Sequence, residues 1–488
     1  MNVKHKKFIY GGVFTVNIIM NFSKLVFEYQ NIDDKTAYIY NNENITYGEI
    51  KNNTIKLYNF LRQQNISAGQ NVVLIGSDSH YFVSMILACW ARGIKTYCPS
   101  PSFSDTNIKL LCDNLKVKNI FCQSGNKQHL EQNYDQNIFV VEDQIDSQKE
   151  NDSIEFYQWK DEEIVLHFNT TGSTGVPKLI PHTMKNVLTY AKEWADALEV
   201  SQNDIIYCCP KICFNYGFGI SLLVTLFKKA TALLHTGPTS PKKIKDIFNN
   251  HGPTYFFIVP DVAYMLIMKK QEIDFKNVKK IVSAGDFLPP KISNKFENLY
   301  NKKILDLIGM AETFGFYTMI DDKNQKSGTV GKPMANVKVK CLDGVIHVKT
   351  NYSAKEYLYD TTQTLITFKD GWVKTRDKGH IDSNGYLVFE GRIDNLIKIK
   401  SKFVSPIEIE DALSYYPNIV SSLIFTRKDI NDLPILCANI VCSGEIDVLE
   451  VKKFLSKKLE DHKVPKEIFL VKEIKTTYNG KKIRELTN

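Results

Sequence analysis

Short apolar runs alternate with stretches of helical periodicity along most of the chain, and this alternation constrains the fold more than any other feature. A strand, a helix and a further strand in this order join parallel strands and place helices on the faces of the sheet. The runs that predict strands are residues 37–40, 71–75, 94–98, 119–122, 164–168, 230–234, 255–259 and 280–283. The sequence therefore predicts an α/β fold with largely parallel sheets.

The pattern changes twice in the second half of the chain. Between Gly328 and Phe389, short strands separated by turns predict a small β-barrel-like subdomain. After Arg392, a lysine-rich segment leads into an α+β tail, where Ser405 and Pro406 are residue types that begin a helix. Because 488 residues exceed the size of a single hydrophobic core, we expect a multidomain α/β protein.

The predicted division has three parts. Residues 20–392 form a large N-terminal domain, made of α/β sheet subdomains and the small β-barrel-like subdomain, and residues 393–488 form a small α+β C-terminal domain. Residues 1–19 are predicted to be an N-terminal appendage or a misplaced start. The apolar run at residues 8–20 contains Asn17 and is too short for a membrane span, so we expect no membrane span.

Charge and cysteine content argue against several classes of protein. The chain has 62 Lys and Arg against 54 Asp and Glu, and a net charge of +8 is too dilute for a clustered nucleic-acid surface. We expect no nucleic-acid partner; a nucleotide ligand and a simple lysine-rich face both fit the basic surface. The 10 cysteines include no CxxC pair, which predicts reduced thiols in a cytoplasmic protein rather than disulfides or a zinc site.

The most informative segment follows the predicted strand 164–168 and reads Phe168-Asn-Thr-Thr-Gly-Ser-Thr-Gly-Val-Pro-Lys178. Glycines let backbone N–H groups surround phosphate oxygens, hydroxyls donate further hydrogen bonds, and a lysine adds a positive charge. The spacing is not that of a Walker A loop. The alternative is a flexible surface turn. The residues predicted to hold nucleotide phosphates are Thr170, Thr171, Gly172, Ser173, Thr174, Gly175 and Lys178.

This loop resembles the phosphate-binding signature of the adenylate-forming superfamily, which includes acyl- and aryl-CoA ligases and the adenylation domains of peptide synthetases. Five further segments resemble superfamily motifs in the same order along the chain. They are the adenine-contacting segment at residues 283–289, the magnesium-associated segment at 306–312, the ribose motif at 375–377, the hinge at 391–398, and the catalytic-lysine motif at 477–481 followed by Arg484.

The resemblance implies an AMP-forming acid–thiol ligase that uses ATP and Mg²⁺. Lys481 would bridge the carboxylate and the α-phosphate, and Glu312 would be a catalytic residue that holds Mg²⁺. Asp394 would be the hinge of a mobile C-terminal domain that carries Lys481. The acceptor thiol would belong to CoA or to the phosphopantetheine of an acyl or aryl carrier protein. Further nucleotide-binding residues would be Gly285, Asp306, Asp377 and Arg392.

Within the superfamily, residues 210–219 and 256–260 are most similar to benzoate-type CoA ligases. The resemblance implies that Asn215, Tyr216 and Gly217 border a flat aromatic acid, with space left at Gly285 and Gly309. The predicted reaction is ATP-dependent adenylation of a benzoate-type acid with release of pyrophosphate, followed by thioester formation. Alternatives are an ordinary buried aromatic strand at this position, a medium- or long-chain fatty acyl ligase, or a non-catalytic nucleotide- or acyl-binding partner of a biosynthetic complex.

Three residues depart from the superfamily pattern. Ala311 stands where a threonine usually precedes the glutamate, Arg376 replaces a glycine beside the ribose aspartate, and Ser401 replaces a glycine that faces the thiol tunnel. The bulk of Arg376 could crowd the nucleotide, or its charge could pair with a phosphate.

Overall fold

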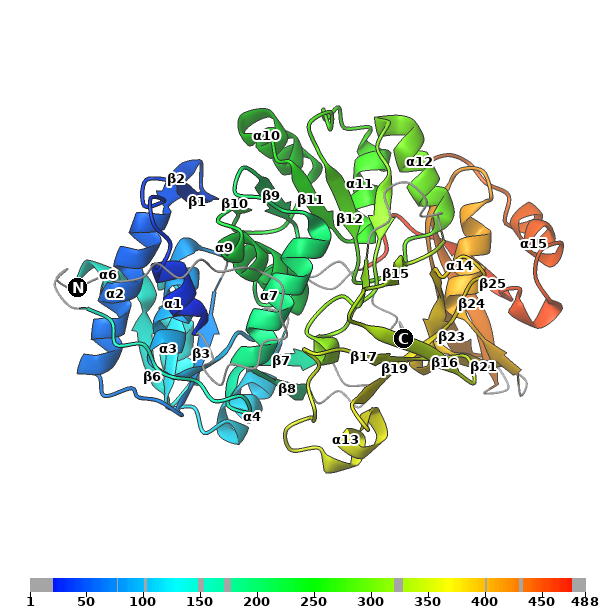
Figure 1. Cartoon of the computed structure of the whole chain (residues 1–488). Coiled ribbons are helices and arrows are strands. Elements are labelled where there is room, and N and C mark those ends of the chain that lie inside the picture. The colour runs from blue at the N-terminus through cyan, green and yellow to red at the C-terminus, as the bar shows by residue number, and fades with distance from the viewer. Residues whose placement is uncertain are drawn as a thin grey trace.

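The computed structural model describes residues 21–76, 78–100, 103–147, 153–170, 177–319, 328–399, 402–429 and 433–475. Figure 1 shows two α/β layers in the blue-to-green half of the chain and several smaller sheets in the yellow-to-red half. The chain begins with the short helix α1 (Phe22–Phe27), which packs against the first of these layers.

One sheet has six strands in the order β6-β5-β3-β4-β7-β8. Its neighbouring strands are parallel except for β7 and β8, which form an antiparallel pair at one edge. Strand–helix–strand units produce this arrangement. Its elements are α2 (Tyr47–Gln63), β3 (Asn71–Ile75), α3 (His80–Ala91), β4 (Lys95–Tyr97), α4 (Asp105–Asn114), β5 (Asn119–Cys122), η1 (Ser124–Asn126), α5 (Lys127–Asn133), β6 (Asn137–Val140), α6 (Val141–Asp146), β7 (Ile164–Thr170) and β8 (Lys178–Thr183).

A second sheet has seven strands in the order β13-β12-β11-β9-β10-β1-β2, all parallel except for the antiparallel edge pair β1 and β2. Its strands are β1 (Thr36–Tyr40), β2 (Glu43–Thr46), β9 (Ile205–Cys208), β10 (Thr231–Leu234), β11 (Tyr255–Ile258), β12 (Lys280–Ser283) and β13 (Ile304–Asp306). Its helical segments are α7 (Met184–Leu198), α8 (Asn215–Gly217), η2 (Phe218–Val224), α9 (Thr225–Phe227), α10 (Pro241–His251), α11 (Pro260–Lys269), α12 (Pro290–Tyr300) and η3 (Ala311–Thr313).

Local sequence explains where the helices begin and which ones are buried. Thr46 and Glu49 form a capping box at the start of α2, because each side chain accepts a hydrogen bond from the other residue's backbone N–H. All residues of α3 except Tyr81 are buried, as expected for a helix that is apolar on every face. A shared core that includes Trp90, Trp194 and Ile346 joins both large sheets to the smaller sheet that follows.

The region after β13 consists of small antiparallel sheets. A five-stranded sheet contains the path β16-β17-β19-β18, and β20 pairs with β19. Alternate residues of β19 are buried, so Thr375 and Asp377 lie on one face and Arg376 on the other. The elements are β14 (Thr318–Met319), β15 (Lys332–Pro333), β16 (Lys338–Leu342), β17 (Val345–Lys349), α13 (Thr361–Thr367), β18 (Phe368–Lys369), β19 (Trp372–Ile381) and β20 (Leu387–Arg392).

The C-terminal part has its own hydrophobic core, which includes Leu413, Ile424 and Leu455. A three-stranded sheet in the order β23-β24-β25 packs against helices of this part. Its elements, together with the two-stranded sheet before them, are η4 (Ile393–Asn395), β21 (Ile397–Ile399), β22 (Lys402–Val404), α14 (Pro406–Ser414), β23 (Ile419–Lys428), β24 (Pro434–Cys442), α15 (Val448–Ser456), η5 (Asp461–Lys463) and β25 (Glu467–Leu470).

The predicted fold class is confirmed, and every predicted strand is present with its ends shifted by only a few residues. Two local details differ from the sequence predictions. The short helix α13 interrupts the predicted β-rich region, and the Ser405 hydroxyl, at the N-cap of α14, donates to Glu390 O at 3.3 Å instead of capping the helix. The predicted segment 1–19 lies outside the described residues.

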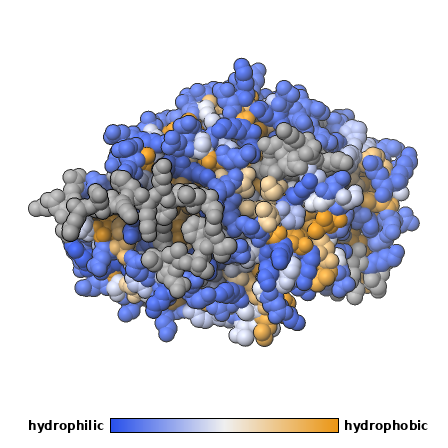
Figure 2. All heavy atoms as spheres, viewed as in Figure 1, coloured by the Kyte–Doolittle hydropathy of each residue, from blue (hydrophilic) through white to orange (hydrophobic). Residues whose placement is uncertain are grey.

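The surface and the thiols agree with a folded globular chain. Figure 2 shows a mainly hydrophilic face, with hydrophobic residues visible chiefly in the half that carries the small sheets. All 10 cysteines are free thiols, most of them buried. Within the described residues, none of the helices combines the length and the apolar character that a membrane crossing needs.

Candidate functional site

The predicted phosphate loop lies at the tip of the β7–β8 hairpin. Thr170 at the end of β7 and Lys178 at the start of β8 are direct partners in the antiparallel ladder. The hairpin therefore fixes both ends of the loop against one edge of the six-stranded sheet. The loop residues Thr171, Gly172, Ser173, Thr174 and Gly175 lie outside the described residues.

Glu312 lies in η3, directly after the seven-stranded sheet, and is only 5% exposed. The Tyr357 hydroxyl donates to Glu312 Oε1 at 2.6 Å, and Ala354 N donates to Glu312 O at 2.8 Å. Burial and the neighbouring Glu312 carboxylate raise the pKa of Tyr357, so its hydroxyl stays protonated and remains a donor. The segment after β17 thus holds both the carboxylate and the backbone of Glu312.

Lys178 connects the phosphate hairpin to Glu312 and to α13. Its Nζ lies 5.1 Å from the centroid of the Tyr357 ring and donates to Gln363 Oε1 at 3.2 Å. The guanidinium of Arg376 donates to the same oxygen of Gln363. We call these five residues, Lys178, Glu312, Tyr357, Gln363 and Arg376, the phosphate-side cluster. It brings together chain segments that are up to 198 residues apart, from β8 to β19.

The predicted ribose residues lie next to this cluster on β19 and β20. Asp377 and Arg392 are paired in the ladder, and Arg392 Nη1 lies 3.7 Å from Asp377 Oδ1. Asp377 is buried, and its backbone N–H donates to Thr375 Oγ1 at 3.1 Å. The structure therefore brings the two predicted residues together and holds the carboxylate in a fixed position.

Two further predicted nucleotide residues lie at the carboxyl ends of parallel strands. Asp306 ends β13 and is the ladder partner of Ser283, which ends β12. Burial raises the pKa of Asp306 well above its ordinary value. Gly285 follows β12 with φ +95°, a backbone conformation that glycine adopts freely. Ligand sites of open α/β sheets form at this edge of the sheet.

The predicted substrate residues Asn215 and Tyr216 lie beside the same edge, where Tyr216 and Phe316 are buried in the shared core. The Tyr216 hydroxyl donates to Val282 O at 3.1 Å. The Tyr216 and Phe316 rings pack edge to face, with their centroids 4.8 Å apart. Asn215 Nδ2 donates to Phe314 O at 3.5 Å. The hydroxyl and the ring of Tyr216 are thus both used within the fold.

Two of the predicted substrate glycines have a packing reason of their own. A Cβ at Gly217 would lie 2.2 Å from Lys211 O, and a Cβ at Gly309 would lie 2.5 Å from Gly315 O. Backbone therefore approaches backbone at both positions, and no larger residue fits without displacement. Their contact with an acid substrate stays a prediction.

Ala311, one of the three departures, has a clear place in the structure. It begins η3, and its carbonyl oxygen lies 2.8 Å from Nε2 of the buried His182. Burial lowers the pKa of His182 to about 3, so the ring is neutral near neutral pH and Nε2–H can donate to this carbonyl. The backbone before Glu312 is thus held through an imidazole, a role that the sequence did not reveal.

A buried polar cluster that the sequence did not indicate lies near the predicted substrate residues. Lys211 Nζ donates to His235 O at 2.6 Å, and Ile212 N donates to Asp78 Oδ1 at 2.9 Å. Burial raises the pKa of Asp78 to about 6, and burial together with nearby lysines lowers the pKa of His235 to about 3. Asp78 follows β3, and His235 follows β10. Polar residues soon after a predicted parallel strand were therefore the signal that could have indicated this cluster.

The remaining predictions concern the C-terminal part. The catalytic lysine Lys481, the neighbouring Arg484 and the departure Ser401 lie outside the described residues. The backbone of the predicted hinge residue Asp394 lies in η4, between β20 and β21. Its role as a hinge stays a prediction.

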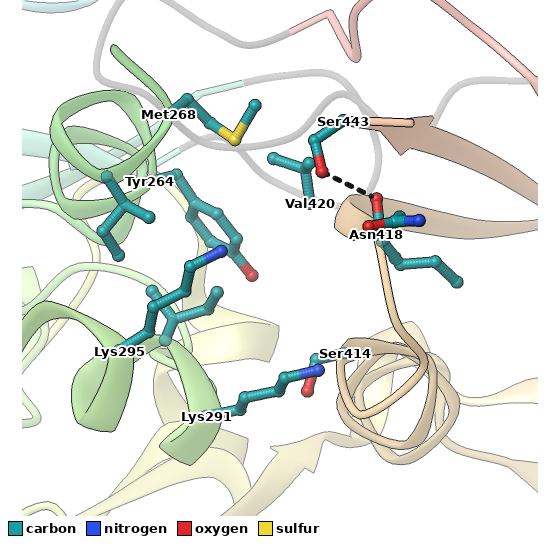
Figure 3. Close-up of a pocket in the computed structure, with 11 residues that line it drawn as sticks. Tyr264, Met268, Lys291, Lys295, Ser414, Asn418, Val420 and Ser443 are labelled. Atoms are coloured by element: carbon teal, nitrogen blue, oxygen red, sulfur yellow. Dashed lines mark hydrogen bonds between the residues drawn. The ribbon is translucent and has the colours of Figure 1, made fainter. Parts of the chain in front are cut away.

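A cavity of about 100 Å³ lies between α11 and α12 on one side and α14 and the start of β23 on the other (Figure 3). Tyr264, Lys291 and Lys295 face it from the large unit, and Ser414 and Asn418 face it from the C-terminal part. We call it the α12–α14 cavity. None of the predicted site residues lines it, so it is separate from the phosphate-side cluster.

The site fits a magnesium ion that is shared with a phosphate ligand. Tyr357 occupies Oε1 of Glu312, and among the described residues no side chain donates to Oε2. The described ranges also contain no group of three or more His, Cys, Asp or Glu side chains that could enclose a metal ion. Mg²⁺ prefers one or two carboxylates together with phosphate oxygens and water, which suits a single fixed carboxylate.

Comparisons with known proteins agree with this geometry. The chain is 24% identical to the 3-hydroxybenzoate–CoA ligase of Aromatoleum sp. (strain CIB), over 94% of each chain. Its fold matches the crystal structure of the anthranilate CoA ligase AuaEII in complex with anthranoyl-AMP, with a TM-score of 0.88, 21% identity and 96% of each chain covered.

A third relative was solved with a nucleotide and a metal ion. The o-succinylbenzoate coenzyme A synthetase of Bacillus subtilis, in complex with ATP and magnesium, matches with a TM-score of 0.84 and 19% identity, covering 95% of this chain and 98% of that one. The model of the AMP-binding enzyme family matches residues 28–353, which include Thr170, Lys178 and Glu312. The chain therefore belongs to the AMP-binding enzyme family and is an AMP-forming acid–thiol ligase of that family.

Proposed function

We propose that this ligase activates an aryl, benzoate-type carboxylic acid as its adenylate and passes the acyl group to a thiol. In the first step, a carboxylate oxygen attacks the α-phosphorus of ATP, an acyl-AMP forms, and pyrophosphate leaves. In the second step, the thiol of CoA or of a carrier-protein phosphopantetheine attacks the acyl carbon, and AMP leaves. The observation that carries the proposal is the buried Glu312 carboxylate, fixed by Tyr357 at 2.6 Å beside Lys178 and the Asp377–Arg392 pair.

The barrier of the first step is electrostatic, because a carboxylate must approach a polyanion. Fixed donors and cations lower such a barrier when they are in place before the reaction. Lys178 and the loop residues Thr170, Thr171, Ser173 and Thr174 would hold the β- and γ-phosphates. Bound at Glu312, Mg²⁺ would neutralise phosphate charge. Asp377 would accept hydrogen bonds from the ribose hydroxyls, with Arg392 holding its carboxylate.

The aromatic surroundings and the relatives support an aryl acid. The buried rings of Tyr216 and Phe316 pack beside the carboxyl ends of β11 and β12, next to where the adenylate would lie. The relative from Aromatoleum acts on a hydroxybenzoate, and the solved relative AuaEII holds anthranoyl-AMP. Flat rings pack well against aromatic walls in edge-to-face or offset arrangements.

In the proposed mechanism, residues 20–392 surround the nucleotide, and residues 393–488 form a mobile C-terminal domain. Lys481 would supply a positive charge between the carboxylate and the α-phosphate in the first step. Rotation about Asp394 would then exchange Lys481 for the face that admits the thiol. The separate hydrophobic core of the C-terminal part is compatible with movement as a unit.

ATP–pyrophosphate exchange tests this function, because it isolates the first step. Purified protein with Mg²⁺ is assayed with benzoates, cinnamates, short and long fatty acids, and amino acids. We expect exchange with a benzoate and none with octanoate, and a thioester assay with CoA then tests the acceptor. Exchange that is strongest with octanoate, or products that are ADP and phosphate, would contradict the proposal. Loss of exchange in Lys481→Ala would confirm the catalytic lysine.

A further inference from the structure

Two cations, from β8 and β19, converge on one neutral oxygen. Lys178 Nζ donates to Gln363 Oε1 at 3.2 Å, and the Arg376 guanidinium donates to the same atom. Hydrogen bonds from a cation are considerably stronger when the acceptor is an anion than when it is a neutral amide. The Gln363 oxygen therefore occupies a position that suits an anionic oxygen better than an amide oxygen.

The backbone at Arg376 is unusual for an arginine. Its φ is +64°, in the left-handed region, which is unfavourable for a residue that carries a Cβ. Thr375 and Asp377 lie on the buried face of β19, so the Arg376 side chain leaves the strand on the opposite face, toward Gln363. The pairing of β17 with β19 is irregular between Lys374 and Lys378, and such a bulge explains this backbone conformation. Bulges often re-aim a side chain beside a functional site.

Gln363 is held by its backbone more than by its side chain. Gln363 N donates to Asp360 Oδ1 at 3.0 Å, and Thr364 Oγ1 donates to Asp360 O at 2.8 Å. These contacts anchor the start of α13 and do not involve the side-chain amide group of Gln363. The side chain of Gln363 can therefore rotate away from Lys178 and Arg376 while α13 stays in place.

We propose that Arg376 binds the pyrophosphate portion of the nucleotide together with Lys178, and that the Gln363 amide occupies this anion position until the phosphates displace it. The planar guanidinium of arginine suits bidentate contact with phosphate oxygens. This inference rests on the proposed adenylation, in which pyrophosphate is the leaving group. Asp377, the next residue, would bind the ribose, so two neighbouring residues of β19 would contact the ribose and the pyrophosphate portion.

Isothermal titration calorimetry of the full-length protein tests the inference without knowledge of the acid. Magnesium pyrophosphate and AMP serve as separate probes, because only pyrophosphate would reach Arg376. We expect Arg376→Gly to weaken pyrophosphate binding about 10-fold or more while AMP binding changes less than about 2-fold. Arg376→Lys should retain most of the pyrophosphate affinity. Glycine fits the left-handed backbone, so the variant should fold, and its thermal midpoint checks this.

A second variant tests the role of Gln363. Gln363→Glu places a carboxylate between the two cations, so we expect pyrophosphate binding to weaken about 10-fold and AMP binding to stay unchanged. Lys374→Gln, which removes a cation two residues from Arg376 on the same strand, is the matched control and should change neither affinity. Equal loss of AMP and pyrophosphate affinity in Arg376→Gly, or unchanged pyrophosphate affinity in both variants, would overturn the inference. If wild-type protein binds both probes but exchanges with no acid, the proposed function fails while this inference still holds.

Discussion

The phosphate-side cluster and the α12–α14 cavity are built in opposite ways. In the cluster, Glu312, Tyr357 and Lys178 are linked through one hydrogen bond of 2.6 Å and one ring contact of 5.1 Å. In the cavity, the hydrogen bond marked in Figure 3 joins Ser443 Oγ to Asn418 O at 3.4 Å, and Ser443 N donates to the same oxygen at 2.9 Å. Lys291 lies over the Tyr415 ring at 5.8 Å, and burial with the nearby Lys295 and Lys458 lowers its pKa.

Under the proposed mechanism, this difference would separate a group that stays fixed from an interface that moves. Groups that stabilise charge in a transition state act best when they need no rearrangement at the moment of reaction. An interface between parts that slide or rotate is better served by few specific bonds and loose packing. We therefore expect changes in the cluster to affect adenylation strongly and changes in the cavity to affect it little.

The largest effect is expected from Glu312→Gln. Loss of the buried carboxylate removes the group that would hold Mg²⁺, so the ATP–pyrophosphate exchange rate should fall about 100-fold or more. Glu356→Gln, next to Tyr357 but exposed, is the matched control and should stay within about 2-fold of wild type. Comparable rates for both variants would show that the cluster is not the centre of the reaction.

A smaller loss is expected from Tyr357→Phe, which keeps the ring and removes the hydroxyl that donates to Glu312. Partners that orient a metal ligand are typically worth about 10- to 100-fold in metal affinity or activity. The Mg²⁺ concentration needed for half-maximal exchange should rise accordingly. Tyr359→Phe, whose exposed hydroxyl donates to Asn114 O, is the control. An unchanged Mg²⁺ dependence in Tyr357→Phe would remove the positioning role.

Acid should destabilise the large unit before the C-terminal part. Burial lowers the pKa of His167, His182 and His235 to about 3, and all three lie in the large unit. Unfolded histidine binds a proton below about pH 6.5, so this stability is present above pH 6.5 and is lost as pH falls toward 3. At pH 5, each of these histidines therefore lowers the free energy of unfolding by about 2 kcal/mol.

Hydrogen exchange measured by mass spectrometry at pH 7 and pH 5 checks this pH dependence, because it resolves the two parts separately. Unfolding followed in parallel by tryptophan fluorescence reports on the large unit alone, since Trp90, Trp159, Trp194 and Trp372 all precede residue 393. His182→Gln should reduce the pH dependence of the unfolding free energy. If hydrogen exchange depended equally on pH in both parts, the acid sensitivity would not come from the buried histidines of the large unit.

The smallest effect is expected at the cavity. Replacing Lys291 and Lys295 together by Gln removes two like charges without opening the core, so stability should change by about 0.5 kcal/mol or less. The exchange rate should stay within about 2-fold of wild type. A 10-fold loss of exchange would show that the cavity contributes to the first step and that the comparison fails.

Much of the fold was predictable because its signals are local. Each predicted strand is a run of apolar residues that a sheet must bury, and turn residues mark where it ends. The start of α2 at Thr46 and Glu49 needs only neighbouring residues. The short helix α13 was missed, because its single cap, Asp360, is a weak signal inside a region of turns.

The candidate site was predictable only in part. Residue types in Thr170–Lys178 and the resemblance around Glu312 and Asp377 indicated phosphate, metal and ribose contacts. Tyr357 and Gln363 carry no such pattern, since a lone tyrosine or glutamine in a polar stretch has many roles. The buried Asp78, Lys211 and His235 were missed for the same reason, because each residue alone resembles an ordinary loop position.

The sequence by itself determined the α/β class, the positions of the strands along the chain and the family to which the chain belongs, because apolar periodicity and short motifs depend on neighbouring residues. The tertiary structure decided which distant side chains meet. Tyr357 reaches Glu312 across 45 residues and Lys178 reaches Gln363 across 185, pairings that only the packing of β7, β8, η3 and α13 against one another brings about. Local patterns cannot encode such pairs, because the free energy that selects them comes from burying whole elements together.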